Sequence, residues 1–214
     1  MPDGTLQRGP SERRSPRHRT GRVLGLTGPV AGGKTFLLRL FREAGAATVE
    51  ADAVYARLVR AGEPLLSAIG GAFPGAIRSD GSLDREELGA LVFHDPSALR
   101  RLSEITHPAL GRAVAETVAE CLSTGTRHLI IEAAVLFSIG ADALCDEVWF
   151  VSAPVEERVR RLIAGRGWTE DRARAVVDAH GEMPEIHAEC AREVDGESSS
   201  ETLRDLVREW MDAG

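Results

Sequence analysis

The chain has 214 residues, of which 43% are hydrophobic, 5% aromatic and 28% charged, with a formal net charge of −7. These values favour one folded α/β domain with an aliphatic core, and they exclude a fibrous or wholly disordered protein. No stretch approaches 18 consecutive apolar residues, so we expect no membrane-spanning helix and no membrane partner.

The charge is distributed unevenly along the chain. Residues 1–22 carry six Arg against two acidic residues, a net +4, whereas the remainder carries 20 Lys and Arg against 31 Asp and Glu, a net −11. An acidic body argues against a nucleic-acid partner but permits a nucleotide in a local positive pocket. The three cysteines are far apart and show no metal-ligand spacing, which predicts a reduced, cytoplasmic protein: Cys121, Cys145 and Cys190.

The N-terminal segment differs from everything that follows it. Residues 1–21 are rich in Gly, Pro, Ser and Arg and nearly lack large apolar side chains, so we predict a disordered basic tail. A single folded domain is then expected over residues 22–214, as a monomer or weak homo-oligomer.

Apolar runs and glycines divide that domain into elements. Strands are predicted at 23–27, 47–51, 128–132 and 147–151, with helices at 35–41 and 200–211. Residues 53–126 are helical in pattern and too long for a simple crossover, so we expect an inserted helical lobe. Residues 155–181 read as a charged helix pair around Gly165-Arg166-Gly167, which suits a mobile lid.

A phosphate-binding motif lies between the first predicted strand and helix. The run Gly28-Pro29-Val30-Ala31-Gly32-Gly33-Lys34-Thr35 satisfies G-x-x-x-x-G-K-[ST] in the strand–loop–helix context that the motif requires. Successive N–H groups and the helix N-terminus are suited to bind phosphate, Lys34 to reach the β and γ oxygens, and the Thr35 hydroxyl to ligate Mg²⁺. We therefore predict ATP and Mg²⁺ as cofactors and a three-layer α/β fold of the P-loop kinase type.

Lys34 is the only lysine in the chain, and every other permanently cationic side chain is Arg. A sequence that avoids lysine still places one where a compact ammonium is needed among phosphates. The alternative, a Gly-rich turn with a chance lysine, fits this context less well. Pro29 is unusual because it removes one N–H from the loop.

Two carboxylates follow predicted strands and are candidates for work on an acceptor hydroxyl. Asp52 comes just after the second strand and is a candidate general base, although a helix cap for a segment starting at Ala53 is an equal alternative. Glu132 ends the third strand and could orient a Mg²⁺-bound water or the acceptor, or could be a surface carboxylate.

The chain resembles the dephospho-CoA kinase family from about Arg22 to its C-terminus. The loop is similar to the family's GLTGGIGSGKST, Glu50-Ala51-Asp52 resembles its DAD, and Glu132 to Phe137 resembles its strand-and-turn element. The stretch from Phe73 to Pro108 is the most specific part, because it follows the pattern F-x-x-x-I-x-x-D-G-x-L-x-R and then the dipeptide His-Pro.

The resemblance implies phosphorylation of the 3′-hydroxyl of dephospho-CoA by ATP, the last step of coenzyme A synthesis. It implies that Asp52 is the base, that the helical lobe binds the acceptor and that the lid closes over ATP. Arg161 keeps a family position and is the third predicted catalytic residue, with Lys34 and Asp52. Arg166 and Phe36 complete the predicted nucleotide site, and Arg85 and His107, with Glu132, are predicted acceptor contacts, although a surface charge and a structural histidine remain alternatives for Arg85 and His107.

Some positions depart from the family pattern, namely Pro29, Ala31, Ala56, Ser138 and Gly165. They leave two other hypotheses open: another small-molecule or nucleoside monophosphate kinase, and a relative that binds nucleotide without transferring phosphate. His180, His187 and Cys190 fit no standard zinc spacing, so no metal site is predicted there.

Overall fold

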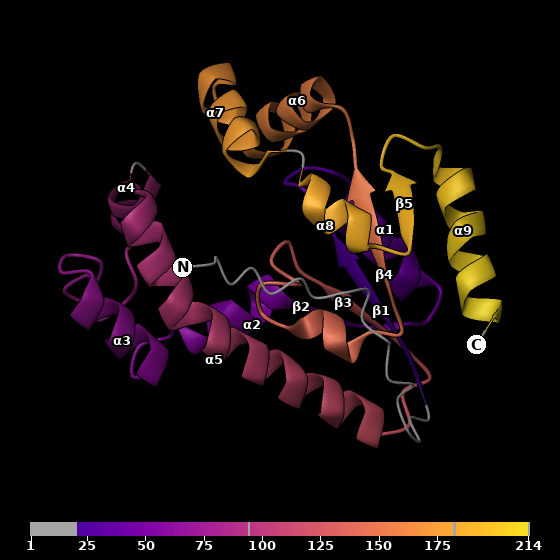
Figure 1. Cartoon of the computed structure of the whole chain (residues 1–214), viewed down its shortest axis with the longest axis horizontal. Coiled ribbons are helices and arrows are strands. Elements are labelled where there is room, and N and C mark those ends of the chain that lie inside the picture. Colours follow the sequence, from indigo (N-terminus) through magenta and orange to yellow (C-terminus); the bar gives the residue numbers. More distant parts are fainter. Residues whose placement is uncertain (1–20, 94, 182, 214) are drawn as a thin grey trace, which may run out of the picture.

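The computed structural model describes residues 21–93, 95–181 and 183–213. The predicted basic tail, apart from Gly21, lies outside the described residues. The centre of the domain is a five-stranded, fully parallel sheet in the order β2-β3-β1-β4-β5 (Figure 1). Its strands are β1 (Arg22–Thr27), β2 (Ala47–Glu50), β3 (His128–Glu132), β4 (Glu147–Ser152) and β5 (Arg192–Asp195). The four predicted strands are confirmed to within one residue, whereas β5 was not predicted.

The strands are short apolar runs because the sheet is covered on both faces. In β1, Val23, Leu24 and Leu26 are fully buried, and β3 buries three consecutive apolar residues. Because all pairs are parallel, the carboxyl ends of the strands meet at one edge of the sheet. In this register Glu132 is paired with Glu50 of β2 and Leu26 of β1, which brings the end of β3 beside the start of the phosphate loop.

Helices form a layer on each face of the sheet, which confirms the predicted three-layer α/β architecture. On one face, α1 (Lys34–Glu43) and α9 (Ser200–Asp212) share an apolar cluster with β1, β3, β4 and β5. On the other, α2 (Ala51–Leu58), the second half of α5 (Pro96–Ser123) and the 3-10 helix η1 (Ala141–Leu144) share a second cluster with the sheet.

A helical lobe lies beyond the sheet and has its own apolar centre. It is formed by α3 (Pro64–Ala72), α4 (Arg85–Phe93) and the first half of α5 (Figure 1). The lobe's core includes Leu66, Ile69 and Leu88, packed against Leu102 and Ile105 of α5. One long helix therefore belongs to the lobe at its start and to the sheet packing at its end.

The predicted charged helix pair is confirmed as α6 (Val155–Arg166) and α7 (Glu170–His180), followed by the short α8 (Pro184–Glu189). Val159 and Leu162 of α6 pack on Ala173 and Val177 of α7, with Trp168 beside them. Within the described residues, no helix combines the length and apolar character that crossing a bilayer requires.

Candidate active site

The phosphate loop connects β1 to α1, as the motif predicts. Gly28 and Gly33 have φ angles of 132° and 114°, which strongly favour glycine. A Cβ on Gly28 would lie 2.2 Å from the carbonyl oxygen of Val151 in β4, so the loop passes directly over the sheet edge. Helix α1 begins at Lys34, and its positive end therefore opens into the loop.

Lys34 is folded back over the loop. Its side chain is buried, and Nζ donates hydrogen bonds of 2.8 Å to the carbonyl oxygens of both Gly28 and Pro29. Burial lowers the pKa of Lys34, while the nearby Glu132 and Asp52 carboxylates act in the opposite direction. The loop thus holds its single ammonium in place through its own backbone.

The two predicted carboxylates lie beside this ammonium. Glu132 ends β3 and is half-buried, and burial raises the pKa of its carboxyl, opposed by Lys34 and reinforced by Asp52. Asp52 lies in the first turn of α2 and is exposed. The structure therefore brings Lys34, Asp52 and Glu132 together at the carboxyl edge of the sheet.

The alternative in which Asp52 caps a helix starting at Ala53 is wrong. Helix α2 begins two residues earlier, at Ala51, and Glu50 occupies the cap position. Because the helix starts directly at the end of β2, Asp52 is its second residue and is held on a rigid element.

The donor set fits a hard divalent cation. Thr35 is exposed in the first turn of α1, directly after Lys34, and the charges of Asp52 and Glu132 act on the Lys34 ammonium. Mg²⁺ prefers oxygen ligands and retains several waters when one or two protein groups and substrate phosphates bind it.

A cleft of about 800 Å³ opens between the phosphate loop, α6 and the turn from β5 to α9. This volume lies within the usual range for ligand pockets, ~300–1,000 Å³. The cleft is lined by most of the predicted nucleotide site and by the predicted catalytic residue Arg161. The residues of the nucleotide site that line it are Ala31, Gly32, Gly33, Lys34, Thr35, Phe36 and Arg166. Gly196, Glu197 and Ser198 also line the cleft and were not among the predicted site residues.

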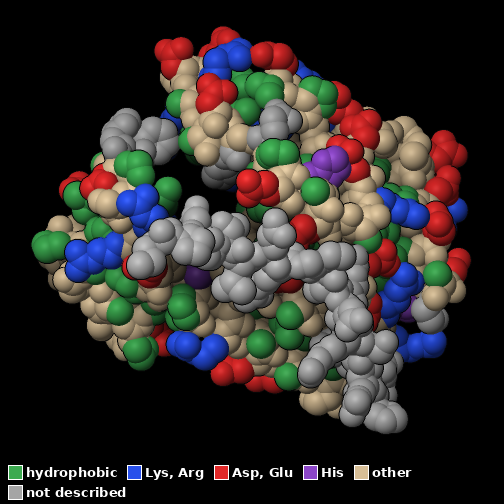
Figure 2. Space-filling view, viewed as in Figure 1, with side chains coloured by type: hydrophobic (Ala, Val, Ile, Leu, Met, Phe, Trp, Pro, Cys, Tyr) green, Lys and Arg blue, Asp and Glu red, His purple; other side chains and the backbone are tan. Residues whose placement is uncertain are grey.

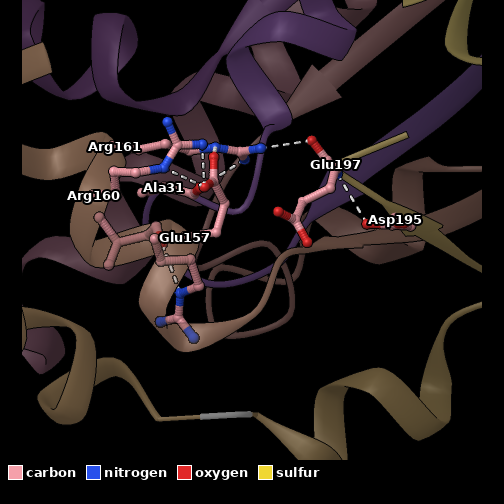
Figure 3. A network of polar contacts seen from close by, with 9 residues as sticks. Ala31, Glu157, Arg160, Arg161, Asp195 and Glu197 are labelled. Carbon is pink, nitrogen blue, oxygen red and sulfur yellow. Dashed lines mark hydrogen bonds and ion pairs between the residues drawn. The ribbon is translucent and has the colours of Figure 1, made fainter. Parts of the chain in front are cut away.

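Arg161 forms a bridge across this cleft (Figure 3). Its Nε donates to Glu157 Oε1 at 2.6 Å, Nη1 to the carbonyl oxygen of Ala31 at 3.1 Å, and Nη2 to that of Gly196 at 2.8 Å. Arg161 therefore ties α6 to the phosphate loop and to the turn after β5. Arg166, at the end of α6, lies over the Trp168 ring at 5.0 Å.

The predicted acceptor contacts occupy two places. Arg85 begins α4, and its guanidinium carbon lies 5.9 Å from the ring centre of Tyr55, one turn after Asp52 on α2. Burial raises the pKa of Tyr55, and Arg85 opposes this shift. His107 instead lines a separate depression of about 430 Å³ on α5, where burial lowers its pKa.

Sequence reasoning missed several residues that line or support this site. Arg158 is 1% exposed and donates from Nε to the carbonyl oxygen of Val30 in the loop at 3.0 Å. Its spacing of three from Arg161 was an available signal, because such residues share a helix face. Tyr55, three residues after Asp52, carried the same signal. Gly196 could be found only through the resemblance, because the family's Asn-Asp-Gly is reduced here to Asp195-Gly196.

A family model for dephospho-CoA kinase matches residues 22–200. A relative named dephospho-CoA kinase, from Symbiobacterium thermophilum, is 36% identical over 187 residues, which are 87% of this chain and 78% of the relative. A solved structure from Thermus thermophilus has a TM-score of 0.72 at 28% identity and covers 90% of this chain and 97% of its own. A dephospho-CoA kinase from Campylobacter jejuni, with a TM-score of 0.63 at 20% identity, covers 89% of this chain and 95% of its own and supports the fold alone.

Proposed function

This chain belongs to the dephospho-CoA kinase family, and from that premise we propose that it transfers the γ-phosphoryl group of ATP to the 3′-hydroxyl of dephospho-CoA. The observation that carries the proposal is the placement of Lys34 between an amide-lined loop and the Asp52–Glu132 carboxylates. An anion site and a proton acceptor at one sheet edge are what phosphoryl transfer to an alcohol needs.

The loop binds the triphosphate in this proposal. Main-chain amides and the start of α1 hold the phosphates, and Lys34 exchanges its two carbonyl partners for the β and γ oxygens. The adenosine part extends into the cleft between α6 and the β5–α9 turn, beside Phe36. Arg161 and Arg166, which line the same cleft, compensate phosphate charge in this proposal.

Asp52 acts as the general base. Its exposed carboxylate accepts the proton of the ribose hydroxyl as the new P–O bond forms, and its place in the first turn of α2 fixes its distance from the loop. Glu132 orients the acceptor or a water. Thr35, with these carboxylates, would hold Mg²⁺, which when bound neutralises charge on the phosphates.

The acceptor enters from the side of the helical lobe. The molecular surface is hollowed between the part built from α6 and α7 and the part built from α3 and α4 (Figure 2). Arg85 and Tyr55 lie on the lobe side and provide a cationic and an aromatic group for a diphosphate-bearing substrate. In this proposal His107 contacts a more distant part of the acceptor, the helix pair closes over ATP, and the enzyme works in the cytoplasm as a monomer or weak homo-oligomer.

The test is a coupled assay of ADP release with Mg-ATP and dephospho-CoA, with AMP, CMP and shikimate as competing acceptors. Of these four acceptors, we expect only dephospho-CoA to be phosphorylated. Asp52→Asn should lower kcat by roughly two to four orders of magnitude while leaving ATP affinity nearly unchanged, because only proton acceptance is lost.

The matched control is Asp205→Asn on the exposed face of α9, which should keep kcat within about twofold of the unmodified protein. No ADP release above background with dephospho-CoA would refute the proposed activity. Full activity of the Asp52→Asn protein would refute only the role of Asp52.

A further inference from the structure

Two arginines of α6 bind consecutive carbonyl groups of the phosphate loop. Arg158 Nε donates to the oxygen of Val30 at 3.0 Å, and Arg161 Nη1 donates to the oxygen of Ala31 at 3.1 Å. Arg158 and Arg161 are three residues apart and share one face of the helix. That single helix face therefore fixes two successive peptide groups of the loop, one of which is visible in Figure 3.

Arg158 is far more deeply buried than a surface lid residue would be. Its side chain is 1% exposed, and Nη2 makes a longer contact of 3.5 Å with the carbonyl oxygen of Val177 in α7. The side chains of Val30 and Ala31 also pack against the apolar cluster between α6 and α7. A buried cation is tolerated only where it is well bonded, so these contacts specify the position of Arg158 closely.

The loop residue between the two bound carbonyls is strained. Ala31 has a φ of 59°, in the left-handed region that is unfavourable for a residue with a Cβ. Its φ and ψ are set by the two peptide planes on either side, and these are the planes whose carbonyls the two arginines hold. Because N–H and C=O point in opposite directions in a trans peptide, holding the Val30 carbonyl toward α6 turns the N–H of Ala31 away from α6.

We propose that Arg158 is a positioning residue for nucleotide binding: together with Arg161 it holds Ala31 in the left-handed conformation and keeps the loop in its phosphate-binding shape. Arg158 acts through the loop backbone and does not touch the nucleotide. The inference rests on the proposed function only in that the loop binds ATP; it does not depend on the acceptor.

The chain offers a direct probe of the loop. Lys34 is its only lysine, so protein grown with ¹⁵N-lysine gives a single backbone amide signal, and that signal comes from the loop itself. Titration with ATP, without an acceptor, then yields a dissociation constant at this position. Thermal unfolding of each variant shows separately whether the fold is retained.

Arg158→Met removes the donors and keeps an unbranched apolar stem. We expect it to weaken ATP binding roughly tenfold, the scale of one charge-assisted hydrogen bond, and to broaden or split the Lys34 signal before ATP is added. Arg174→Met is the matched control, because Arg174 lies on α7 of the same helix pair and pairs with Glu156 and Glu170 on the surface. It should bind ATP within about twofold of the unmodified protein.

The deciding measurement is a double-mutant cycle with Ala31→Gly. Glycine adopts a φ of 59° without strain, so in the Ala31→Gly background Arg158→Met should weaken ATP binding by only about threefold or less. If Arg158→Met does not fold, Arg158→Lys takes its place, since lysine keeps the charge but can donate to only one of the two carbonyls, those of Val30 and Val177. Because this variant carries a second lysine, its ATP dissociation constant is measured by calorimetric titration.

Equal losses of affinity in both backgrounds would overturn the proposal, because they would mean that Arg158 supports the fold without controlling Ala31. Unchanged ATP affinity in Arg158→Met or Arg158→Lys would overturn it as well. These outcomes are distinct from failure of the proposed function, which is recorded by the unmodified protein binding ATP without transferring phosphate to dephospho-CoA.

Discussion

The ammonium of Lys34 is buried and the carboxyl of Glu132 is half-buried, and each reduces the cost of burying the other. Burial lowers the pKa of Lys34 and raises that of Glu132, and in both cases the opposite charge of the partner counteracts the shift. Asp52 acts on Lys34 in the same direction as Glu132, whereas the positive charge of Arg158 adds to the effect of burial. The two carboxylates therefore oppose the loss of charge from Lys34 that its burial favours.

The raised pKa of Glu132 predicts a pH effect on stability. The folded protein holds this proton more tightly than the unfolded chain, whose carboxyl titrates near 4.5. As the pH rises from 4.5 toward the higher pKa that Glu132 has in the folded protein, this carboxyl ionises first in the unfolded chain. The free energy of unfolding therefore falls. Below this window both states are protonated, and above it the loss is complete.

Glu132→Gln removes the fall in stability that ionisation of Glu132 causes, because glutamine does not titrate. The free energy of unfolding of the variant, minus that of the unmodified protein, should therefore increase as the pH rises from about 4.5 through the raised pKa of Glu132. Urea unfolding at a series of pH values measures the difference, in which the other carboxylates largely cancel. A difference that stays constant or decreases with pH would show that the Glu132 carboxyl does not titrate as the structure implies.

At the scale of elements, the turn between β5 and α9 is fitted against the phosphate loop. Gly196 donates its N–H to Ser152 at 2.7 Å, and its carbonyl oxygen accepts from Arg161. A Cβ on this residue would lie 1.9 Å from the carbonyl oxygen of Gly32, closer than atoms can approach. The turn therefore closes one wall of the cleft only because residue 196 is glycine.

We predict that Gly196→Ala displaces the turn and breaks its bond to Arg161. ATP affinity should fall about tenfold or more, and the protein should lose ~1–3 kcal/mol of stability, the scale of overpacking a filled site. Calorimetric titration and thermal unfolding measure the two effects. Gly89→Ala in α4 is the control, because no atom lies within 4 Å of its added Cβ, and there alanine should stabilise the helix by up to ~1 kcal/mol.

The elements that could be predicted from sequence are those whose signal is local. The phosphate loop, the strand before it and the helix after it lie within about twenty residues, and Asp52 follows a strand directly. Strand β5 was missed because Arg192–Asp195 contains three charged residues and buries only Val194. The spacing of three from Arg161 places Arg158 on the same helix face but does not indicate its contact with Val30, which lies 128 positions earlier in the chain.

At the scale of the whole molecule, the apolar core of the described residues is divided into four clusters. One cluster lies on each face of the sheet, a third fills the helical lobe and the fourth lies between α6 and α7. Val30 and Ala31 connect the last cluster to the phosphate loop, and the two halves of α5 connect the lobe to the sheet. The lobe and the helix pair are therefore packed units, each joined to the central sheet through elements that also border the candidate active site.

At the opposite end of the strands, the Glu147 carboxylate is the centre of a polar network. Glu147 of β4 accepts from Arg22 of β1 at 2.7 Å, from the Trp149 ring nitrogen at 3.0 Å and from that of Trp210 in α9 at 2.6 Å. Arg22 in turn lies over the Trp210 ring at 4.5 Å and donates to its carbonyl oxygen. This network fixes the last helix against the first strand, 188 positions apart.

Glu147→Gln should lower the free energy of unfolding by ~1–3 kcal/mol, because the amide can serve as acceptor through only one oxygen and the charge on Arg22 loses its partner. Chemical unfolding, monitored by tryptophan fluorescence, measures this free energy, since two of the three tryptophans donate to the Glu147 carboxylate. The control is Glu209→Gln, which removes an exposed pair with Arg192 and should change stability by less than ~0.5 kcal/mol. The network lies at the end of the strands away from the phosphate loop, so the ATP affinity of the folded Glu147→Gln protein should be unchanged. A loss of ATP affinity in this variant would mean that the packing of α9 also controls the cleft.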